Sequence, residues 1–83
     1  MIKLTIVHIK DCTCCESVIK TAKELEKEMD IELKLQDWEE SKDLIEKNKI
    51  VSSPAIFIND KFVHVGELSK EELKDLIKKY EPR

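Results

Sequence analysis

The sequence predicts an α/β fold in the order β-α-β-α-β-β-α, with a mixed four-stranded sheet and helices on both faces. Three observations predict it. Residues 2–9 form a β-branched run that becomes apolar on both faces, as in a central strand covered from both sides. Residues 15–36 change from helical to alternating apolar spacing, which indicates a β-α-β unit. Short apolar runs on either side of Asn59-Asp60 precede a final amphipathic segment, which predicts a hairpin and a closing helix.

The first helix and the second strand are predicted from their apolar periodicity. After Cys15, apolar residues recur on one helical face over about four turns; they are Val18, Ile19, Ala22, Leu25 and Met29. The lysines and glutamates of residues 23–28 are interpreted as the solvated face of this helix. An alternation of apolar and polar residues then predicts a strand with one wetter face; its apolar members are Ile31, Leu33 and Leu35.

The two remaining helices are predicted from their N-terminal signals. Asp37 and Glu40 have the spacing of a capping box ahead of a short helix that ends near Asn48. Leu44 and Ile45 are expected to form its inner face. For the last helix, Ser69 is the expected N-cap, Glu72 completes a capping box, and Leu68 is placed to pack on Leu73. The expected apolar face is Leu73, Leu76, Ile77 and Tyr80, and Pro82 lies past the end.

Length and charge limit the function classes. With 83 residues, we expect one domain over residues 1–83. The 18 acids and 15 bases are interleaved without a basic stripe, so we expect no nucleic-acid partner. No apolar run approaches the roughly 18 residues that span a bilayer, and the opening segment is typical of a strand and not of a signal peptide. We therefore expect a cytoplasmic monomer that does not contact membranes.

All three cysteines lie together in Cys12-Thr13-Cys14-Cys15, between the first strand and the first helix. Cys12 and Cys15 form a C-x-x-C pair, whose spacing at a helix start lets the two sulfurs meet within one turn. The free amides and the positive end of the helix favour the thiolate of the first cysteine. In a reducing cytosol such a cluster is more often catalytic or metal-binding than structural. Zinc knuckles and copper or mercury carriers use the same spacing, so the pair alone leaves both chemistries open.

A second signal lies far downstream, where Pro54 comes directly before the third predicted strand. Combined with a C-x-x-C pair after the first strand, this pattern resembles the thioredoxin-like superfamily over nearly the whole chain. It is most similar to the small glutaredoxin-like thioredoxins. The resemblance implies thiol-disulfide exchange, in which Cys12 is the exposed nucleophile and Cys15 the resolving thiol. It further implies that Pro54 is cis and faces the cysteine pair, and that the backbone of Ser53 pairs with bound substrate.

The same resemblance implies which partners to expect. These are protein or small-molecule disulfides as substrates, a reductase or thiol reductant as electron donor, and no bound cofactor. The sequence departs from the family pattern at four places. Asp11 stands where a tryptophan usually precedes the first cysteine. Thr13-Cys14 replaces the usual residues between the cysteines, and Ile6 and its apolar neighbours occupy the stretch where thioredoxins carry a buried acid. Glutaredoxins bind glutathione with paired glycines and an acid after the last strand, whereas this chain has the single glycine Gly66, followed by Glu67. Glutathione is therefore not an expected partner.

The alternative function is a soft-metal or metalloid module, in which Cys12, Cys14 and Cys15 capture copper(I), mercury or arsenic(III). Small copper and mercury carriers end in a strand, whereas the capped helix expected at residues 69–80 does not fit that architecture. A thioredoxin-like fold adapted to metal or metalloid transfer stays open because Cys14 adds a third sulfur. A third alternative is an iron–sulfur cluster bridged between the cysteines of two chains. We interpret Cys14 as a spectator, and we assign no metal site.

Overall fold

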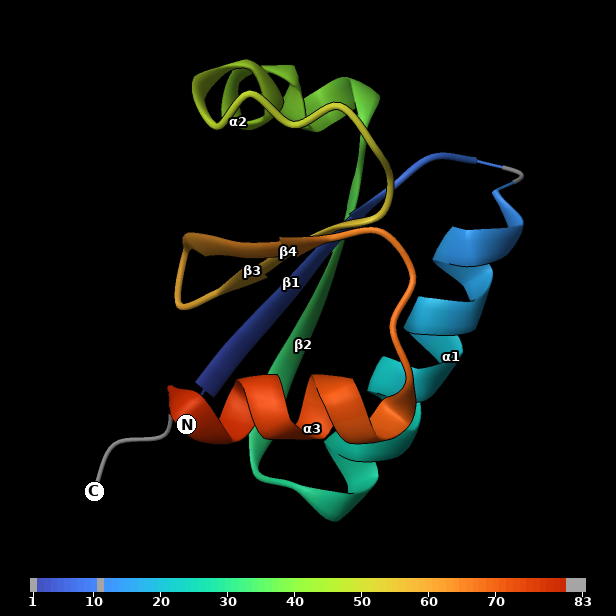
Figure 1. The fold of residues 1–83 in the computed structure, drawn as a ribbon, viewed down its shortest axis with the longest axis vertical. Helices are drawn as coiled ribbons and strands as arrows, with labels where there is room; N and C mark the ends of the chain where they lie inside the picture. The colour runs from blue at the N-terminus through green and yellow to red at the C-terminus, as the bar shows by residue number, and fades with distance from the viewer. Residues whose placement is uncertain (1, 11, 81–83) are drawn as a thin grey trace.

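The computed structural model describes residues 2–10 and 12–80, so Met1, Asp11 and residues 81–83, with Pro82, lie outside the described residues. The order of elements along the chain is the predicted one (Figure 1). The strands are β1 (Ile2–His8), β2 (Ile31–Asp37), β3 (Ala55–Ile58) and β4 (Lys61–Val65). The helices are α1 (Thr13–Glu28), the 3-10 turn η1 (Glu39–Ser41), α2 (Lys42–Lys47) and α3 (Lys70–Lys79).

The four strands form one mixed sheet in the order β2-β1-β3-β4. β1 pairs in parallel with β2 and antiparallel with β3, so that Ile6 lies between Leu35 and Ile56. β3 and β4 pair antiparallel through the predicted hairpin, with a register shift between Ile56 and Phe57. The mixed four-stranded sheet of the sequence prediction is therefore confirmed, with β1 and β3 as the central strands.

Alternate residues of β1 face two separate apolar clusters, because successive side chains of a strand point to opposite faces. Ile2, Leu4 and Ile6 pack into a cluster that includes residues of α1 and α3. Val7 packs on the opposite face into a cluster that includes Ile45 of α2. Figure 1 shows this division: α1 and α3 lie on one side of the sheet and α2 on the other. Helices cover both faces, as predicted.

The hairpin turn and the last helix follow their local sequence signals. Asn59 and Asp60 both have positive φ, +52° and +67°, which is the geometry of a type I′ turn. In α3 the Ser69 hydroxyl accepts from the Glu72 amide, and the Glu72 carboxylate accepts from the Ser69 amide. Leu68 and Leu73 are both buried in the same cluster. The predicted hairpin and the predicted capping box of α3 are confirmed.

The predicted capping box at Asp37 and Glu40 is wrong. The parallel ladder with β1 continues to the end of β2, so that Asp37 is the partner of His8, and the Trp38 amide donates to the His8 carbonyl at 2.8 Å. Asp37 is therefore held as strand and does not cap a helix. In this part of the described chain, neither η1 nor α2 begins with a side-chain cap bond.

Three apolar residues are more exposed than the sequence analysis expects. Leu44 and Ile45 are predicted to form the inner face of α2. Ile45 is buried, with 8% of its surface exposed, whereas Leu44 is 37% exposed because this six-residue helix presents a narrow inner face. Tyr80 is 37% exposed, since it lies at the C-cap of α3 where the helix ends. Ile9 is 42% exposed, because β1 ends at His8. None of the helices in the described residues is long and apolar enough to cross a membrane.

Candidate active site

Cys12 lies at the N-cap of α1, and its backbone is extended immediately before the helix begins. Its Sγ accepts a hydrogen bond from the backbone amide of Cys15 at 3.4 Å. The sulfur thus takes the position of a side-chain oxygen in an ordinary N-cap and meets one of the free amides of the first turn. Cys12 is half-buried, so the site is less open than the exposed nucleophile that the family resemblance implies.

Cys15 lies in the first turn of α1 and points into the protein, where 1% of its surface is exposed. Burial raises the pKa of the Cys15 thiol, and its hydrogen bond with Cys12 raises it further. The backbone amide of Ile9 and the hydroxyl of Ser53 act in the opposite direction, because both donate to the Cys15 sulfur and stabilise its thiolate. Cys15 is thus a protonated thiol at neutral pH, with two donors ready for its anion.

The loop before β3 brings a third group to the two sulfurs. The Ser53–Pro54 peptide bond is cis, and Pro54 is fully buried. The Ser53 Oγ lies 3.6 Å from the Cys12 Sγ, at hydrogen-bonding distance for sulfur. The expectation that this bond is cis and lies across from the cysteine pair is confirmed. The hydroxyl of Ser53 adds a contact that the sequence analysis, which considered only its backbone, missed.

The pKa of Cys12 is lowered from its ordinary value, in the opposite direction to that of Cys15. The largest cause is the hydrogen bond donated by the Cys15 thiol, followed by the one from the Ser53 hydroxyl and then the one from the Cys15 amide. Each of these donors favours the thiolate over the thiol. The two shifts favour a thiolate at Cys12 and a protonated thiol at Cys15.

A thioredoxin domain family model matches residues 2–78. The chain belongs to the thioredoxin family. Solved thioredoxins share its fold: a reduced thioredoxin pre-protein of Schistosoma mansoni aligns with a TM-score of 0.77 and 23% identity, over 95% of this chain and 78% of its own. A mutant thioredoxin of Halobacterium salinarum aligns with a TM-score of 0.76 and 23% identity, over 95% of this chain and 74% of its own. Oxidised mitochondrial thioredoxin 3 of Saccharomyces cerevisiae aligns with a TM-score of 0.75 and 16% identity, over 94% of this chain and 77% of its own. No curated protein sequence matches the chain significantly.

This thioredoxin-family chain has an apolar residue where the resemblance leads us to expect a buried acid. Ile6 is completely buried in the cluster under α1 and α3. The adjacent Thr5 is also buried, and its Oγ1 meets no hydrogen-bond partner among the described residues. Among the described residues, Ser53 brings a polar side chain to the dithiol, with its Oγ 3.6 Å from the Cys12 Sγ.

Cys14, the third thiol, is exposed and lies beside the carboxylate of Glu67. A hydrogen bond to that carboxylate and its negative charge both raise the pKa of Cys14. Within residues 2–10 and 12–80, no three His, Cys, Asp or Glu side chains form a group that could hold a metal ion. The three cysteines are neighbours in sequence, but the structure describes a dithiol and a separate thiol.

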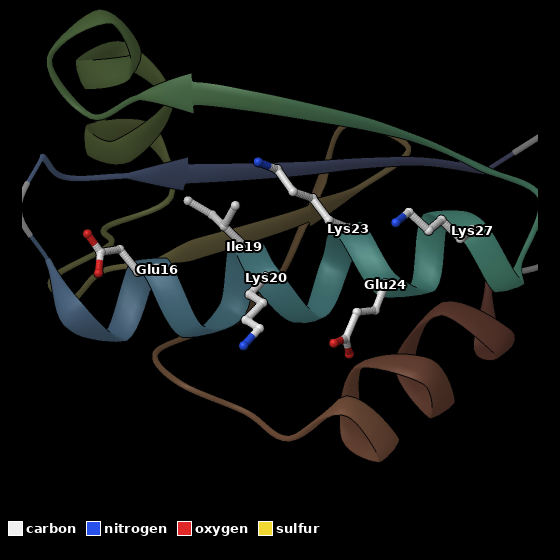
Figure 2. Close-up of a pocket in the computed structure, with 6 residues that line it drawn as sticks. All are labelled: Glu16, Ile19, Lys20, Lys23, Glu24 and Lys27. Carbon is white, nitrogen blue, oxygen red and sulfur yellow. The ribbon is translucent and has the colours of Figure 1, made fainter.

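Two hollows lie on the surface near this site. One, of about 470 Å³, is lined by Ile9, Lys10, Asp37, Trp38 and Glu39, and it adjoins the dithiol because Ile9 donates its amide to Cys15. The other is a groove along α1 (Figure 2). There Ile19 and Lys23 point toward the strands, whereas Lys20 and Glu24 point the opposite way. Because the charged groups of the groove do not converge, we interpret it as the solvated helix face that the sequence predicts.

Replacing Ser53 by alanine is expected to raise the pKa of Cys12, because it removes a donor to the thiolate. The profile of Cys12 alkylation against pH then moves to higher pH, and the rate at neutral pH falls severalfold. Ser52→Ala is the matched control, since Ser52 is an exposed serine of the same loop. A Ser53→Ala profile that coincides with those of the wild type and the control would exclude a role of the hydroxyl.

Proposed function

We propose that this protein is a glutaredoxin-like thiol-disulfide oxidoreductase that carries electron pairs between a thiol donor and disulfide substrates. One observation carries the proposal: at the start of α1, the Cys12 Sγ accepts from the Cys15 amide at 3.4 Å and lies 3.6 Å from the Ser53 Oγ, beside the buried Cys15. These contacts lower the pKa of Cys12, whereas burial raises that of Cys15. A stable thiolate beside a protonated thiol is what two-step disulfide exchange requires. Membership of the thioredoxin family supports the same chemistry.

In the first step, the Cys12 thiolate attacks one sulfur of a substrate disulfide. A bond forms between Cys12 Sγ and that sulfur, while the substrate S–S bond breaks. The second substrate sulfur leaves as a thiolate and takes a proton from water. Cys12 is suited to this attack because its sulfur lies at the N-terminus of α1 and its pKa is lower than that of an ordinary thiol.

In the second step, Cys15 gives its proton to water and its thiolate attacks Cys12 Sγ, which breaks the S–S bond between Cys12 and the substrate. The Cys12–Cys15 disulfide forms and the first substrate sulfur leaves, so the substrate gains two electrons and the protein loses two. Once Cys12 is bonded to substrate it no longer stabilises the Cys15 proton, and the Ile9 amide and the Ser53 hydroxyl remain as donors to the new thiolate. A thiol reductant or a reductase then restores the dithiol.

We propose disulfide-bearing proteins as the principal substrates. Two exposed apolar residues belong to the segments that lead to the dithiol and to Ser53: Ile9, which is 42% exposed, and Val51, two residues before Ser53, which is 90% exposed. Such residues beside a nucleophile favour contact with an extended protein segment. Small disulfides need no such surface and react with Cys12 directly. The proposed setting is the cytoplasm, where a monomer of this kind contributes to cell redox homeostasis.

The test is disulfide reduction with dithiothreitol as electron donor, on insulin and on a small aromatic disulfide. We expect the wild type to reduce both. Val51→Asp is expected to lower kcat/KM for insulin about tenfold, the usual scale for losing one apolar anchor, and to leave the small disulfide unaffected. Leu44→Asp is the control, because Leu44 is an exposed apolar residue of α2 that lines a hollow with Lys3, Phe57 and Asp60 and not with the cysteines.

Absence of turnover with both substrates would contradict the proposed function. Equal losses of Val51→Asp and Leu44→Asp with insulin would contradict only the substrate class. Strong copper(I) or arsenite binding without disulfide turnover, lost in Cys14→Ser, would favour the soft-metal alternative, since serine replaces a soft thiolate by a weak hard ligand. No arrangement of the described residues favours that alternative.

A further inference from the structure

The hollow of about 470 Å³ near the dithiol opens at the carboxyl ends of the parallel strands β1 and β2. Two short segments line it: Ile9 and Lys10, which follow β1, and Asp37, Trp38 and Glu39, which begin with the last residue of β2. In open α/β sheets, ligands commonly bind in the crevice beyond the carboxyl ends of the strands. The volume also lies in the range of pockets that bind ligands.

This hollow is within reach of a substrate held on Cys12. Lys10 is two residues before Cys12, so their Cα atoms are at most about 7.6 Å apart. In an extended substrate, the residues next to the attacked cysteine extend over a similar length. The two lining segments are held together, because the Trp38 amide donates to the His8 carbonyl at 2.8 Å. A side chain beside the substrate cysteine can therefore enter a preformed hollow.

The charged groups of the hollow differ in how firmly they are held. Asp37 is half-buried, has a short side chain on a paired strand residue, and forms no ion pair within the described residues. Glu39 is exposed, and its carboxylate already pairs with Lys42 at 3.0 Å. Lys10 is exposed, and its long side chain can turn the ammonium into solvent. A bound group therefore meets chiefly the carboxylate of Asp37.

Trp38 supplies an aromatic wall beside this carboxylate. Its half-buried side chain packs against the cluster that contains Ile45 of α2, and it also lines the hollow. An indole attracts a cation placed over its ring, arginine more often than lysine. A planar guanidinium can stack on an aromatic ring while its N–H groups donate to a carboxylate. Asp37 and Trp38 thus offer side by side the two groups that arginine binds.

We propose that this hollow binds an arginine side chain next to the reacting cysteine of a substrate protein. The guanidinium donates to the Asp37 carboxylate and stacks on the Trp38 indole, while Ile9 contacts the methylene groups of the arginine. The inference rests on the proposed function, because it names a feature of the disulfide-bearing segments that Cys12 attacks. Disulfides flanked by arginine are then the favoured substrates.

The experiment is a competition between two peptides for Cys12 in the Cys15→Ser variant, which retains mixed disulfides. Each peptide carries one cysteine, placed between two arginines or between two residues of citrulline, the neutral isostere of arginine. Both are supplied in equal amounts in a thiol–disulfide buffer, and mass spectrometry measures the ratio of the adducts at equilibrium. We expect the arginine adduct to be favoured about 3- to 30-fold, the range for one exposed ion pair together with one surface cation–π contact.

Asp37→Asn, made in the same variant, keeps the shape of the side chain and removes its charge. We expect it to lower the preference for arginine about 1.5- to 5-fold. Asp30→Asn is the matched control, because it makes the same change in net charge at an exposed acid directly before β2, about 20 Å from Asp37. A ratio of adducts cancels any effect that either substitution has on the Cys12 thiol itself.

Trp38 is the one tryptophan of the chain, so its fluorescence gives a second readout from the hollow. The arginine adduct should differ in emission from the citrulline adduct, and high salt should reduce the difference. Identical emission from the two adducts would contradict the placement of the guanidinium on the indole.

Equal amounts of the two adducts, or an excess of the citrulline adduct, would overturn the inference. So would an equal loss of preference in Asp37→Asn and Asp30→Asn, which would assign the preference to the net negative charge of the chain. The assay counts adducts and requires no turnover, so these outcomes leave the proposed function intact. Absence of any adduct on Cys12 would instead contradict the proposed function, and the inference with it.

Discussion

Cys12→Ser is expected to abolish disulfide reduction, with a loss of more than about a thousandfold. The reason is that a serine hydroxyl at the N-cap of α1 stays protonated near neutral pH, whereas the contacts to Cys15 and Ser53 lower the pKa of the Cys12 thiol. Serine can accept from the same Cys15 amide, so the fold should be retained. Turnover of insulin with dithiothreitol measures the loss, and thermal unfolding verifies the fold.

Cys15→Ser is expected to stop the reaction one step later. The variant keeps the attacking thiol but lacks the buried thiol that displaces substrate, so a mixed disulfide between Cys12 and substrate should accumulate. Non-reducing electrophoresis and mass spectrometry identify this adduct. Cys14→Ser is the control and should retain turnover near that of the wild type. Adducts on Cys14 in place of Cys12, or full turnover of Cys12→Ser, would reverse the assignment.

The largest effect on stability is expected for Leu73→Ala in α3. Leu73 is completely buried in the cluster that joins α3 and α1 to the sheet. Shortening such a side chain removes buried methyl groups and leaves a cavity, which typically costs about 2–5 kcal/mol. For a domain of this size that is a large part of the total free energy of unfolding. Urea denaturation measures it, with the midpoint falling and the slope nearly unchanged.

Leu44→Ala provides a matched control with the same chemical change in α2. Because Leu44 is 37% exposed, its truncation should cost less than about 1 kcal/mol. The sequence alone predicts comparable losses at the two sites, since it places Leu44 on the inner face of its helix just as it places Leu73 on the apolar face of α3. Equal destabilisation by the two variants would contradict the described packing of α2.

Fold and boundaries were predictable where the decisive interactions are local. The α3 capping box joins residues three apart, and the hairpin turn consists of the adjacent residues Asn59 and Asp60. Each feature can therefore be predicted from a short stretch of sequence. The capping box assigned to Asp37 failed because a distant strand decides its conformation: pairing with His8 extends β2 through that residue. A local capping signal thus yields to pairing with the neighbouring strand, even in the edge strand β2.

The candidate site likewise has a part that the sequence predicts and a part that it does not. The Cys12 and Cys15 spacing at a helix start was readable from the sequence, and Pro54 was placed by the family resemblance. The contacts of Ser53 and Glu67 were not readable, because each comes from a loop far along the chain that folding brings to α1. A hydroxyl directly before the proline, and an acid directly after the one glycine, are the signals that point to them.

The central claim is that Cys12 and Cys15 form one reversible two-electron couple, and equilibration of the protein with mixtures of reduced and oxidised dithiothreitol tests it most directly. We expect two thiols per chain to disappear together as a single two-electron transition. Peptide mapping should find the bond between Cys12 and Cys15, with Cys14 still alkylated. Persistence of both thiols under strongly oxidising conditions, or oxidation only to dimers through Cys14, would contradict it.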